Sequence, residues 1–232
     1  ELVKGKKRIL VFNKSDLADN EATKAWAEEF QRQGFLSLTT NCMSGEGAAR
    51  LLKRLENLQE EKNRGQARKK PYRLMIVGVP NVGKSSLINR LTGRKSTQTG
   101  DRPGVTKGKQ WLSLPGNMQL LDTPGILWPK FEDPEVGLNL AFCGSIKDEI
   151  LDVASLALEL ISLLQREYPE LLVQRYKLEE LSQAPLETME AAAQKRGCIL
   201  PGKKIDYERI ARVVLDEFRS GKIGKITLEK VK

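Results

Sequence analysis

Short apolar runs alternate with stretches of helical character through the first half of the chain. The apolar, β-rich runs lie at residues 8–12, 35–40, 73–77, 111–114 and 118–121. The helical stretches lie at residues 22–33, 46–61 and 84–91. Short apolar runs that end at turn residues are typical of buried strands, and apolar side chains at helical spacing are typical of amphipathic helices. Strands that alternate with helices predict a three-layer α/β domain with a mostly parallel sheet.

The second half of the chain has a helical pattern. Residues 150–164 are nearly all apolar and predict a buried helix. Apolar side chains in residues 207–218 recur at helical spacing, and Asp206 precedes them in a suitable N-cap position. We therefore predict an α/β domain at residues 1–131 and a small all-helical domain at residues 132–232.

Composition narrows the class of protein and the kind of partner. The chain of 232 residues carries a net charge of +9, which favours a polyanionic partner. No apolar run reaches the roughly 18 residues that a membrane-spanning helix needs, so we expect no membrane partner. The three cysteines, Cys42, Cys143 and Cys198, lie far apart and indicate reduced thiols of a cytosolic protein. The chain has no histidine, which excludes a Ser-His triad and a His-ligated metal within it.

A basic stretch at residues 62–73 interrupts the pattern of strands and helices. Its charged residues are Lys62, Arg64, Arg68, Lys69, Lys70 and Arg73, with no acidic residue among them. Such a run is typical of a solvated connector, and direct contact with nucleic acid is the alternative. The basic residues of the C-terminal helix leave the same two alternatives open, a solvated face or a contact with RNA.

A phosphate-binding loop lies at residues 78–85, where Gly-Val-Pro-Asn-Val-Gly-Lys-Ser matches the pattern G-x-x-x-x-G-K-[ST]. A predicted strand precedes this phosphate loop and a predicted helix follows it, which is the context that the motif requires. Lys84 would supply positive charge at the β- and γ-phosphates, and the Ser85 hydroxyl would bind Mg²⁺. The nucleotide-binding residues that we predict here are Asn81, Val82, Gly83, Lys84, Ser85 and Ser86.

Two later segments complete a predicted magnesium and γ-phosphate site. Asp122 begins the sequence Asp-Thr-Pro-Gly directly after a predicted strand, where its carboxylate would hold Mg²⁺. The N–H of Gly125 would contact the γ-phosphate. Thr106, in a Gly-Pro loop before a strand, would close on Mg²⁺ and the γ-phosphate, with Thr99 as the alternative. The predicted catalytic residues are Lys84, Thr106, Asp122 and Gly125, and the predicted magnesium ligands are Ser85, Thr106 and Asp122.

The sequence Asn13-Lys14-Ser15-Asp16 predicts specificity for guanine. The Asp16 carboxylate would accept from N1–H and from the exocyclic amine of guanine, and adenine has a different donor pattern on that edge. Asn13 would accept from the base or tie neighbouring loops together. After the strand at residues 35–40, Asn41 and Cys42 lie where a GTPase supports the base through a backbone N–H. A plain strand-to-helix turn is the alternative for these two residues.

The order of the motifs indicates a narrower class than a P-loop protein. In an ordinary GTPase the guanine motif follows the phosphate loop, and here it comes first. The chain resembles the circularly permuted GTPases and, more closely, the ribosome biogenesis GTPase A family. The matching motifs are at residues 13–16, 78–86, 99–106 and 122–133, and the resemblance spans essentially the whole chain. It implies a circularly permuted P-loop GTPase domain followed by a helical domain that binds RNA or the ribosome.

The resemblance also implies an activity, cofactors and partners. The implied protein binds GTP and GDP with Mg²⁺ and hydrolyses GTP in late maturation of the large ribosomal subunit. Its implied partners are the precursor of that subunit, which stimulates hydrolysis, and the rRNA, from which hydrolysis releases the protein. Asn81 would help to coordinate a potassium ion, or would form only a loop hydrogen bond. We expect a monomer without a DNA partner, in the cytoplasm or, alternatively, in a mitochondrial or chloroplast matrix.

The chain departs from the pattern of GTPases at two places. Ile126 occupies the position where many GTPases have a water-orienting Gln, and its aliphatic side chain cannot orient water. The resemblance implies that a His in an N-terminal segment replaces it. A GTPase sheet also has a further strand beside the strand that precedes Asn13. We expect the natural protein to extend N-terminally and to supply both the strand and the His.

Two other functions compete with an assembly GTPase. A nucleotide-gated RNA-binding module with negligible hydrolysis would also fit the Ile at position 126. A P-loop ATPase with an accidental Asn-Lys-Ser-Asp sequence is the third possibility. Preference for GTP over ATP separates this last class from the other two.

Overall fold

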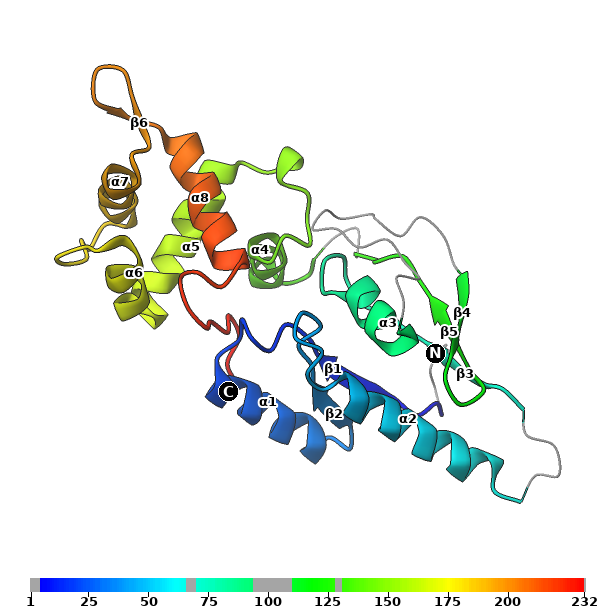
Figure 1. The fold of residues 1–232 in the computed structure, drawn as a ribbon. Helices are drawn as coiled ribbons and strands as arrows, with labels where there is room; N and C mark the ends of the chain where they lie inside the picture. The colour runs from blue at the N-terminus through cyan, green and yellow to red at the C-terminus, as the bar shows by residue number, and fades with distance from the viewer. Residues whose placement is uncertain (1–4, 66–69, 94–109, 128–130, 232) are drawn as a thin grey trace. The chain divides into compact units, whose positions relative to one another are not determined.

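The chain divides into two compact units. The structure is a computed structural model that describes residues 5–65, 70–93, 110–127 and 131–231. Residues 1–128 and 229–232 form the first unit, which we call the α/β unit, and residues 129–228 form the helical unit (Figure 1). The functional division expected between residues 131 and 132 stays a prediction. None of the helices in the described residues is long and apolar enough to cross a membrane.

The α/β unit combines parallel and antiparallel strands. Its strands are β1 (Ile9–Phe12), β2 (Leu36–Thr39), β3 (Tyr72–Met75), β4 (Gln110–Leu114) and β5 (Met118–Asp122). β1 pairs with β2 in parallel, β3 pairs with β5 in parallel, and β4 pairs with β5 antiparallel. Between β4 and β5, positive φ angles at Gly116 and Asn117 let the chain reverse.

The predicted α/β class is confirmed, but the described strands do not form one continuous ladder. They pair as β1–β2 and as β3–β5–β4. β3 and β4 are the outer strands of the three-stranded ladder, and Met75 at the end of β3 is 51% exposed. The additional strand that we expect upstream stays a prediction.

Three helices pack against these strands. They are α1 (Asn20–Arg32), α2 (Ala48–Asn63) and α3 (Lys84–Thr92). The core joins Leu51 and Leu55 of α2 to Ile88 of α3 and to Met118 and Leu120 of β5. This packing fixes the start of α3, and therefore the phosphate loop before it, relative to the end of β5.

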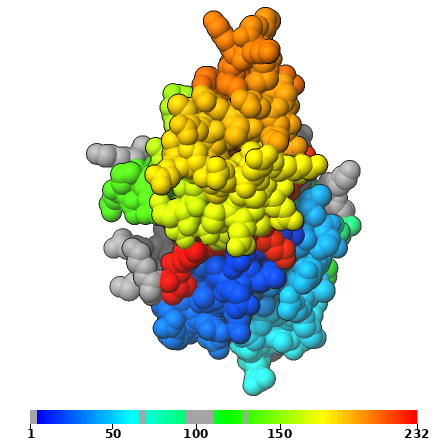
Figure 2. Space-filling view, turned by 90° about the vertical axis from the view of Figure 1, so that its left-hand side faces the viewer, coloured from blue at the N-terminus to red at the C-terminus, as the bar shows by residue number. Residues whose placement is uncertain are grey.

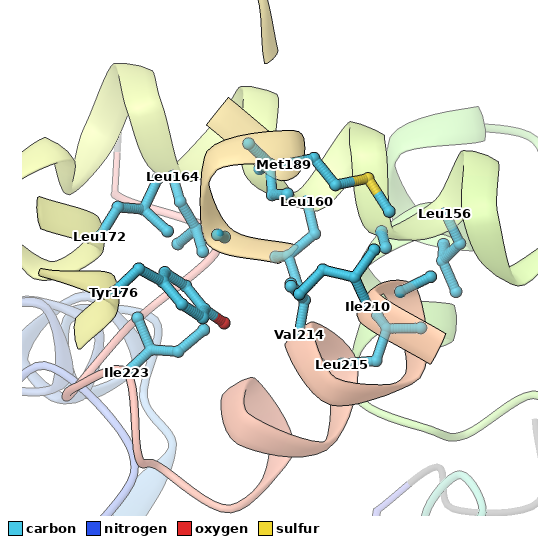
Figure 3. Close-up of a cluster of buried hydrophobic side chains, with 14 of the residues drawn as sticks. Leu156, Leu160, Leu164, Leu172, Tyr176, Met189, Ile210, Val214, Leu215 and Ile223 are labelled. Carbon is cyan, nitrogen blue, oxygen red and sulfur yellow. The ribbon is translucent and has the colours of Figure 1, made fainter. Parts of the chain in front are cut away.

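The helical unit is built around α5. Its helices are α4 (Pro134–Phe142), η1 (Asp148–Ile150), α5 (Val153–Glu167), α6 (Pro169–Tyr176), α7 (Pro185–Arg196) and α8 (Tyr207–Arg219). Leu160 and Leu164 of α5 meet Tyr176 of α6, Met189 of α7 and Val214 of α8 in a fully buried cluster (Figure 3). The apolar pattern of α5 and α8 therefore reflects the core that these helices share.

The two helices predicted for this unit are present. α8 begins at Tyr207, where the Asp206 side chain accepts from the Arg209 N–H, as predicted. α5 begins at Val153 because the Asp152 side chain caps its first turn, and it continues to Glu167. The short hairpin of β6 (Ile199–Leu200) and β7 (Lys204–Ile205) was not predicted, and it projects from the helical unit (Figure 1; Figure 2).

Ion pairs between charged side chains also join the helices of this unit. Arg175 donates to both carboxylate oxygens of Glu217 at 3.0 and 2.6 Å, and Arg196 contacts the same carboxylate at 3.0 Å. Burial raises the pKa of Glu217, but the hydrogen bond from Arg175 and the charge of Arg196 outweigh it, so the pKa is lowered overall. Arg219 similarly pairs with Asp148 at 2.7 Å. Glu217 therefore links α6, α7 and α8.

Replacing Glu217 by glutamine is expected to lower the free energy of unfolding of the helical unit by about 2 kcal/mol at pH 7, because two arginines lose their partner. Because the Glu217 pKa is lowered on folding, this stabilisation is present above the ordinary pKa of 4.5 and is lost as the pH falls through the folded value. Urea unfolding followed by circular dichroism at several pH values would measure the effect.

The matched control is Glu208→Gln, because Glu208 pairs with Arg212 on the same helix but both side chains are largely exposed. Its effect should stay below about 0.5 kcal/mol. Equal effects of the two substitutions would contradict the role of Glu217.

Candidate functional site

The phosphate loop connects the end of β3 to the start of α3. Gly83 is the N-cap of α3 at a φ of 91°, and no side chain caps this helix end. Asn81 also has a positive φ of 60°. A helix N-terminus that follows such a loop presents backbone N–H groups and the positive end of its dipole, which is an anion-binding arrangement. Ser85 and Ser86 lie in the first turn of α3 and are partly buried.

The Lys84 side chain folds back across the phosphate loop. Its Nζ donates to the carbonyl oxygens of Gly78 at 3.0 Å and Val79 at 2.8 Å. Burial lowers the pKa of the Lys84 ammonium, and the negative charge of Asp122 partly offsets this. The lysine therefore places a partly desolvated positive charge inside the loop, where it can act on a phosphate.

The sequence Asp-Thr-Pro-Gly at the end of β5 lies against the same loop. Asp122 is fully buried, and the Thr123 hydroxyl donates to the Ile76 carbonyl at 2.7 Å, which ties the ends of β5 and β3 together. A Cβ added at Gly125 would lie 2.7 Å from the Pro80 nitrogen and 2.9 Å from Lys84 Nζ. Only glycine allows this approach, so the structure brings Lys84, Asp122 and Gly125 together.

The residues predicted to bind Mg²⁺ are only partly described. Ser85 offers a hydroxyl and Asp122 a carboxylate, and both are the hard oxygen ligands that Mg²⁺ prefers. The charge of Asp122 acts on Lys84, so the carboxylate belongs to this site. Thr106 and its alternative Thr99 lie outside the described residues. The donor chemistry of Ser85 and Asp122 fits a Mg²⁺ ion bound together with nucleotide phosphates.

Asn13 joins the guanine motif to the phosphate loop. Its Nδ2 donates to the Val82 carbonyl at 2.9 Å, and its Oδ1 accepts from the Thr40 hydroxyl and from the Cys42 thiol, both at 3.0 Å. Of the two roles considered for Asn13, the structure shows the tie between loops. This amide holds together three loops that are distant in the sequence.

The rest of the guanine motif follows in a tight turn. Lys14 has a φ of 56°, its carbonyl accepts from the Leu17 N–H at 2.9 Å, and the Ser15 N–H donates to the Thr40 carbonyl at 3.2 Å. The turn is anchored by backbone bonds, and the Asp16 side chain is exposed at its tip. This placement leaves the carboxylate accessible to a base.

The loop at residues 41–45, which we call the base-supporting loop after its predicted role, is held by hydrogen bonds of its own side chains. Asn41 Oδ1 accepts from the N–H groups of Met43 at 2.8 Å and Ser44 at 3.2 Å. Burial raises the pKa of the Cys42 thiol, although Thr40 and Arg90 lower it. The thiol donates to Asn13 Oδ1, which connects this loop to the guanine motif.

Two residues that the sequence did not single out also shape this site. The Thr40 hydroxyl orients Asn13, and Arg90 of α3 donates to carbonyls of the base-supporting loop. Thr40 ends a β-rich run and Arg90 lies in the last turn of a helix, where either residue type is common for reasons unrelated to a ligand. No motif marks them, so only the three-dimensional arrangement identifies them.

Replacing Gly83 by alanine is expected to weaken GDP binding at least a hundredfold. A Cβ at Gly83 would lie 2.1 Å from Asn13 Nδ2, and its φ of +91° disfavours any side chain. The added methyl group would therefore displace both the phosphate loop and Asn13 of the guanine motif. Fluorescence titration with a labelled GDP would measure the change.

Gly93 provides a matched control, because it also has a positive φ, at the other end of α3, and a Cβ there would meet no atom of the described residues within 4 Å. Gly93→Ala should cost about 1 kcal/mol of stability and leave GDP affinity unchanged. Similar losses of affinity in both variants would contradict the contact between Gly83 and Asn13.

Comparison with known proteins agrees with the geometry of this site. Residues 3–132 match the family model described as RsgA GTPase, and residues 73–193 match the model described as 50S ribosome-binding GTPase. The P-loop fold, the guanine motif and their reversed order define a circularly permuted GTPase, an enzyme that hydrolyses GTP.

Individual relatives define the family within this class. The chain is 42% identical over 99% of its length to "Ribosome biogenesis GTPase A" of Bacillus cereus, of which it covers 79%, and 44% identical to the protein of that name from Priestia megaterium, of which it covers 81%. The chain therefore belongs to the ribosome biogenesis GTPase A family. A crystal structure of GNP-bound YlqF from T. maritima is similar with a TM-score of 0.67 and 31% identity, over 98% of this chain and 83% of that chain.

Proposed function

We propose that this GTPase acts in late maturation of the large ribosomal subunit, that it binds rRNA, and that GTP hydrolysis releases it. The observation that carries the proposal is the 42% identity over 99% of the chain to a protein named for ribosome biogenesis. The net charge of +9 supports an RNA partner, because the neutralisation of phosphates is the main source of affinity for nucleic acids. GTP alone does not require such a charge.

The phosphate loop and the end of β5 carry the proposed chemistry. Lys84 neutralises charge on the β- and γ-phosphates in the transition state. Ser85, Asp122 and Thr106 would hold a Mg²⁺ ion, which would supply further positive charge to the phosphates. The Gly125 N–H contacts the γ-phosphate, and the contact is lost when phosphate leaves. Asn81, which has a positive φ in the phosphate loop, would offer its side-chain oxygen to a potassium ion.

Guanine recognition is assigned to the opposite end of the site. Asp16 accepts from the base edge, and the stem of Lys14 covers the base, with Ser15 in the turn between them. Asn13 holds this turn against the phosphate loop through Val82. Asn41 and Cys42 form the loop that supports the base from the other side.

The chain connection couples the site to the helical unit. Only a few residues separate Gly125 from the start of the helical unit at residue 129. A change at the γ-phosphate therefore reaches the helical unit through a short covalent link. We assign the contact with rRNA to the helical unit, whose projecting hairpin carries the exposed Lys203 and Lys204 (Figure 2).

Ile126 indicates that the partner takes part in hydrolysis. Its side chain is 71% exposed next to Gly125 and has no polar atom to orient a water molecule. The isolated protein should therefore hydrolyse GTP slowly, and the ribosomal particle should stimulate it. The same observation favours the second candidate, a nucleotide-gated RNA-binding module with negligible hydrolysis even on the particle.

Sedimentation with purified large ribosomal subunits tests the proposal. We expect the protein to co-sediment with large subunits in the presence of a non-hydrolysable GTP analogue and to dissociate from them in the presence of GDP. It should not co-sediment with small subunits. Binding should also weaken steeply with salt, because phosphate contacts release counterions. Failure to co-sediment, or equal binding to both subunits, would contradict the assignment to the large subunit.

Single-turnover hydrolysis with and without large subunits separates the two candidates. A rate increase of more than tenfold on the particle supports an assembly GTPase that the particle stimulates. Equal, very slow rates in both conditions, together with binding that depends on the nucleotide, support the RNA-binding module.

A further inference from the structure

Arg90 lies in the last turn of α3, and its side chain donates to a loop that is distant in the sequence. Its Nε donates to the Cys42 carbonyl at 2.6 Å, and its Nη2 donates to the Met43 carbonyl. These acceptors are 48 and 47 residues away in the sequence. A Cβ added at Gly45 would lie 3.5 Å from Nη1, so the guanidinium also covers the backbone of Gly45. One arginine thus holds the base-supporting loop at two consecutive carbonyls and lies beside Gly45.

The chemistry of this contact suits arginine. Two consecutive carbonyl oxygens accept from two N–H groups of one planar guanidinium, and charge-assisted bonds of this kind are stronger than neutral ones. An arginine in the last turn of a helix ordinarily interacts with the carbonyls of its own helix. Here the donors instead point to a different loop, which indicates a role beyond helix capping.

The contact belongs to a chain of hydrogen bonds that links three segments of the site. Arg90 donates to the Cys42 carbonyl, the Cys42 thiol donates to Asn13, and Asn13 donates to the Val82 carbonyl in the phosphate loop. α3 begins directly after that loop and leads back to Arg90. Hydrogen bonds therefore connect the base-supporting loop to both ends of α3, although the loop and the helix are far apart in the sequence.

We propose that Arg90 is a positioning residue for the guanine base. By tying the base-supporting loop to α3, whose N-terminus binds the phosphates, it fixes the distance between the base and phosphate ends of the site. Its donors bond to carbonyls of the base-supporting loop, so it should act through that loop, affect nucleotide affinity and leave the chemical step unchanged. The inference rests on the proposed assignment of residues 41–45 to the base.

The test compares Arg90→Gln and Arg90→Lys with the wild-type chain. Arg90→Gln should raise the KM for GTP and the Kd for GDP about tenfold, the effect of losing about 1.4 kcal/mol at 25 °C, with kcat at saturating GTP unchanged. Arg90→Lys keeps a charged donor and should recover part of the affinity, to about threefold above the wild-type KM. Steady-state hydrolysis and titration with labelled GDP give these values.

Arg32→Gln is the matched control, because Arg32 makes an ion pair with Glu29 on an exposed helix end of the same unit. It should leave both KM and Kd unchanged. Melting temperatures without nucleotide separate positioning from stability, since a purely structural role would lower the melting temperature and leave KM unchanged below it.

The outcomes also separate this inference from the proposed site. If the wild-type chain prefers GDP over ADP and both Arg90 variants bind GDP as tightly as wild type, the positioning role is wrong and the site assignment stands. A lower kcat at unchanged KM would also overturn it. If Arg90→Gln does not fold, the KM of Arg90→Lys alone decides. Absence of guanine preference in the wild-type chain would instead overturn the site assignment itself.

Discussion

Replacing Asp16 by asparagine is expected to weaken GTP binding about a thousandfold and to raise the affinity for xanthosine triphosphate. The carboxylate accepts two hydrogen bonds from guanine, each worth about 1.5–3 kcal/mol because one partner is charged. An asparagine would turn an N–H₂ group towards the exocyclic amine, so a donor would face a donor. Xanthine has a carbonyl at that position and accepts from the new amide instead.

The position of Asp16 lets this test measure base recognition without a change in the fold. The turn is held by backbone bonds of Lys14 and Ser15, and the Asp16 side chain is exposed, so the substitution should leave the fold intact. Competition titrations with GTP, ATP and xanthosine triphosphate measure the change. Asp216→Asn, an exposed aspartate of α8, is the control and should change none of the affinities. A variant that still prefers GTP would contradict the assignment of the base.

The sequence predicted the motifs of this site better than the contacts between them. The phosphate loop, the end of β5 and the guanine motif are defined by short local patterns, because each needs glycines or polar residues at fixed spacing. The approach of Gly125 to Lys84 and the tie from Asn13 to Val82 join segments that are far apart in the sequence. Such contacts depend on the packing of whole elements, which periodicity does not reveal.

In the fold, too, long local patterns were predictable and short elements or distant contacts were not. α8 was predictable because its apolar residues repeat at helical spacing over several turns, after Asp206 in the N-cap position. The hairpin of β6 and β7 has two residues in each strand, too few for a pattern. The sequence also did not indicate that Arg196 pairs with Glu217 of another helix. The partner of a charged residue cannot be found from a single sequence.

The second large effect concerns Lys84. Lys84→Met should lower kcat/KM for GTP hydrolysis about a thousandfold and weaken GDP binding much less. Removal of one group that stabilises transition-state charge typically costs about a hundred- to a thousandfold in rate. Lys84 Nζ lies among carbonyl oxygens within a partly buried loop, where low polarity strengthens its interaction with developing phosphate charge. Single-turnover hydrolysis measures the rate.

Lys84→Arg tests whether the positive charge alone is enough or the shape of the lysine side chain is also needed. Gly125 packs closely on Lys84, since an added Cβ would lie 2.9 Å from Nζ, and the larger planar guanidinium fits this space poorly. Lys84→Arg should therefore be nearly as inactive as Lys84→Met although it keeps the charge. Lys53→Met removes an exposed lysine of α2 and should leave the rate unchanged. If Lys84→Arg keeps wild-type activity, charge alone is sufficient and the close packing of Gly125 on Lys84 is not needed for hydrolysis. If Lys84→Met stays within threefold of wild type, the phosphate loop is not the site of the reaction.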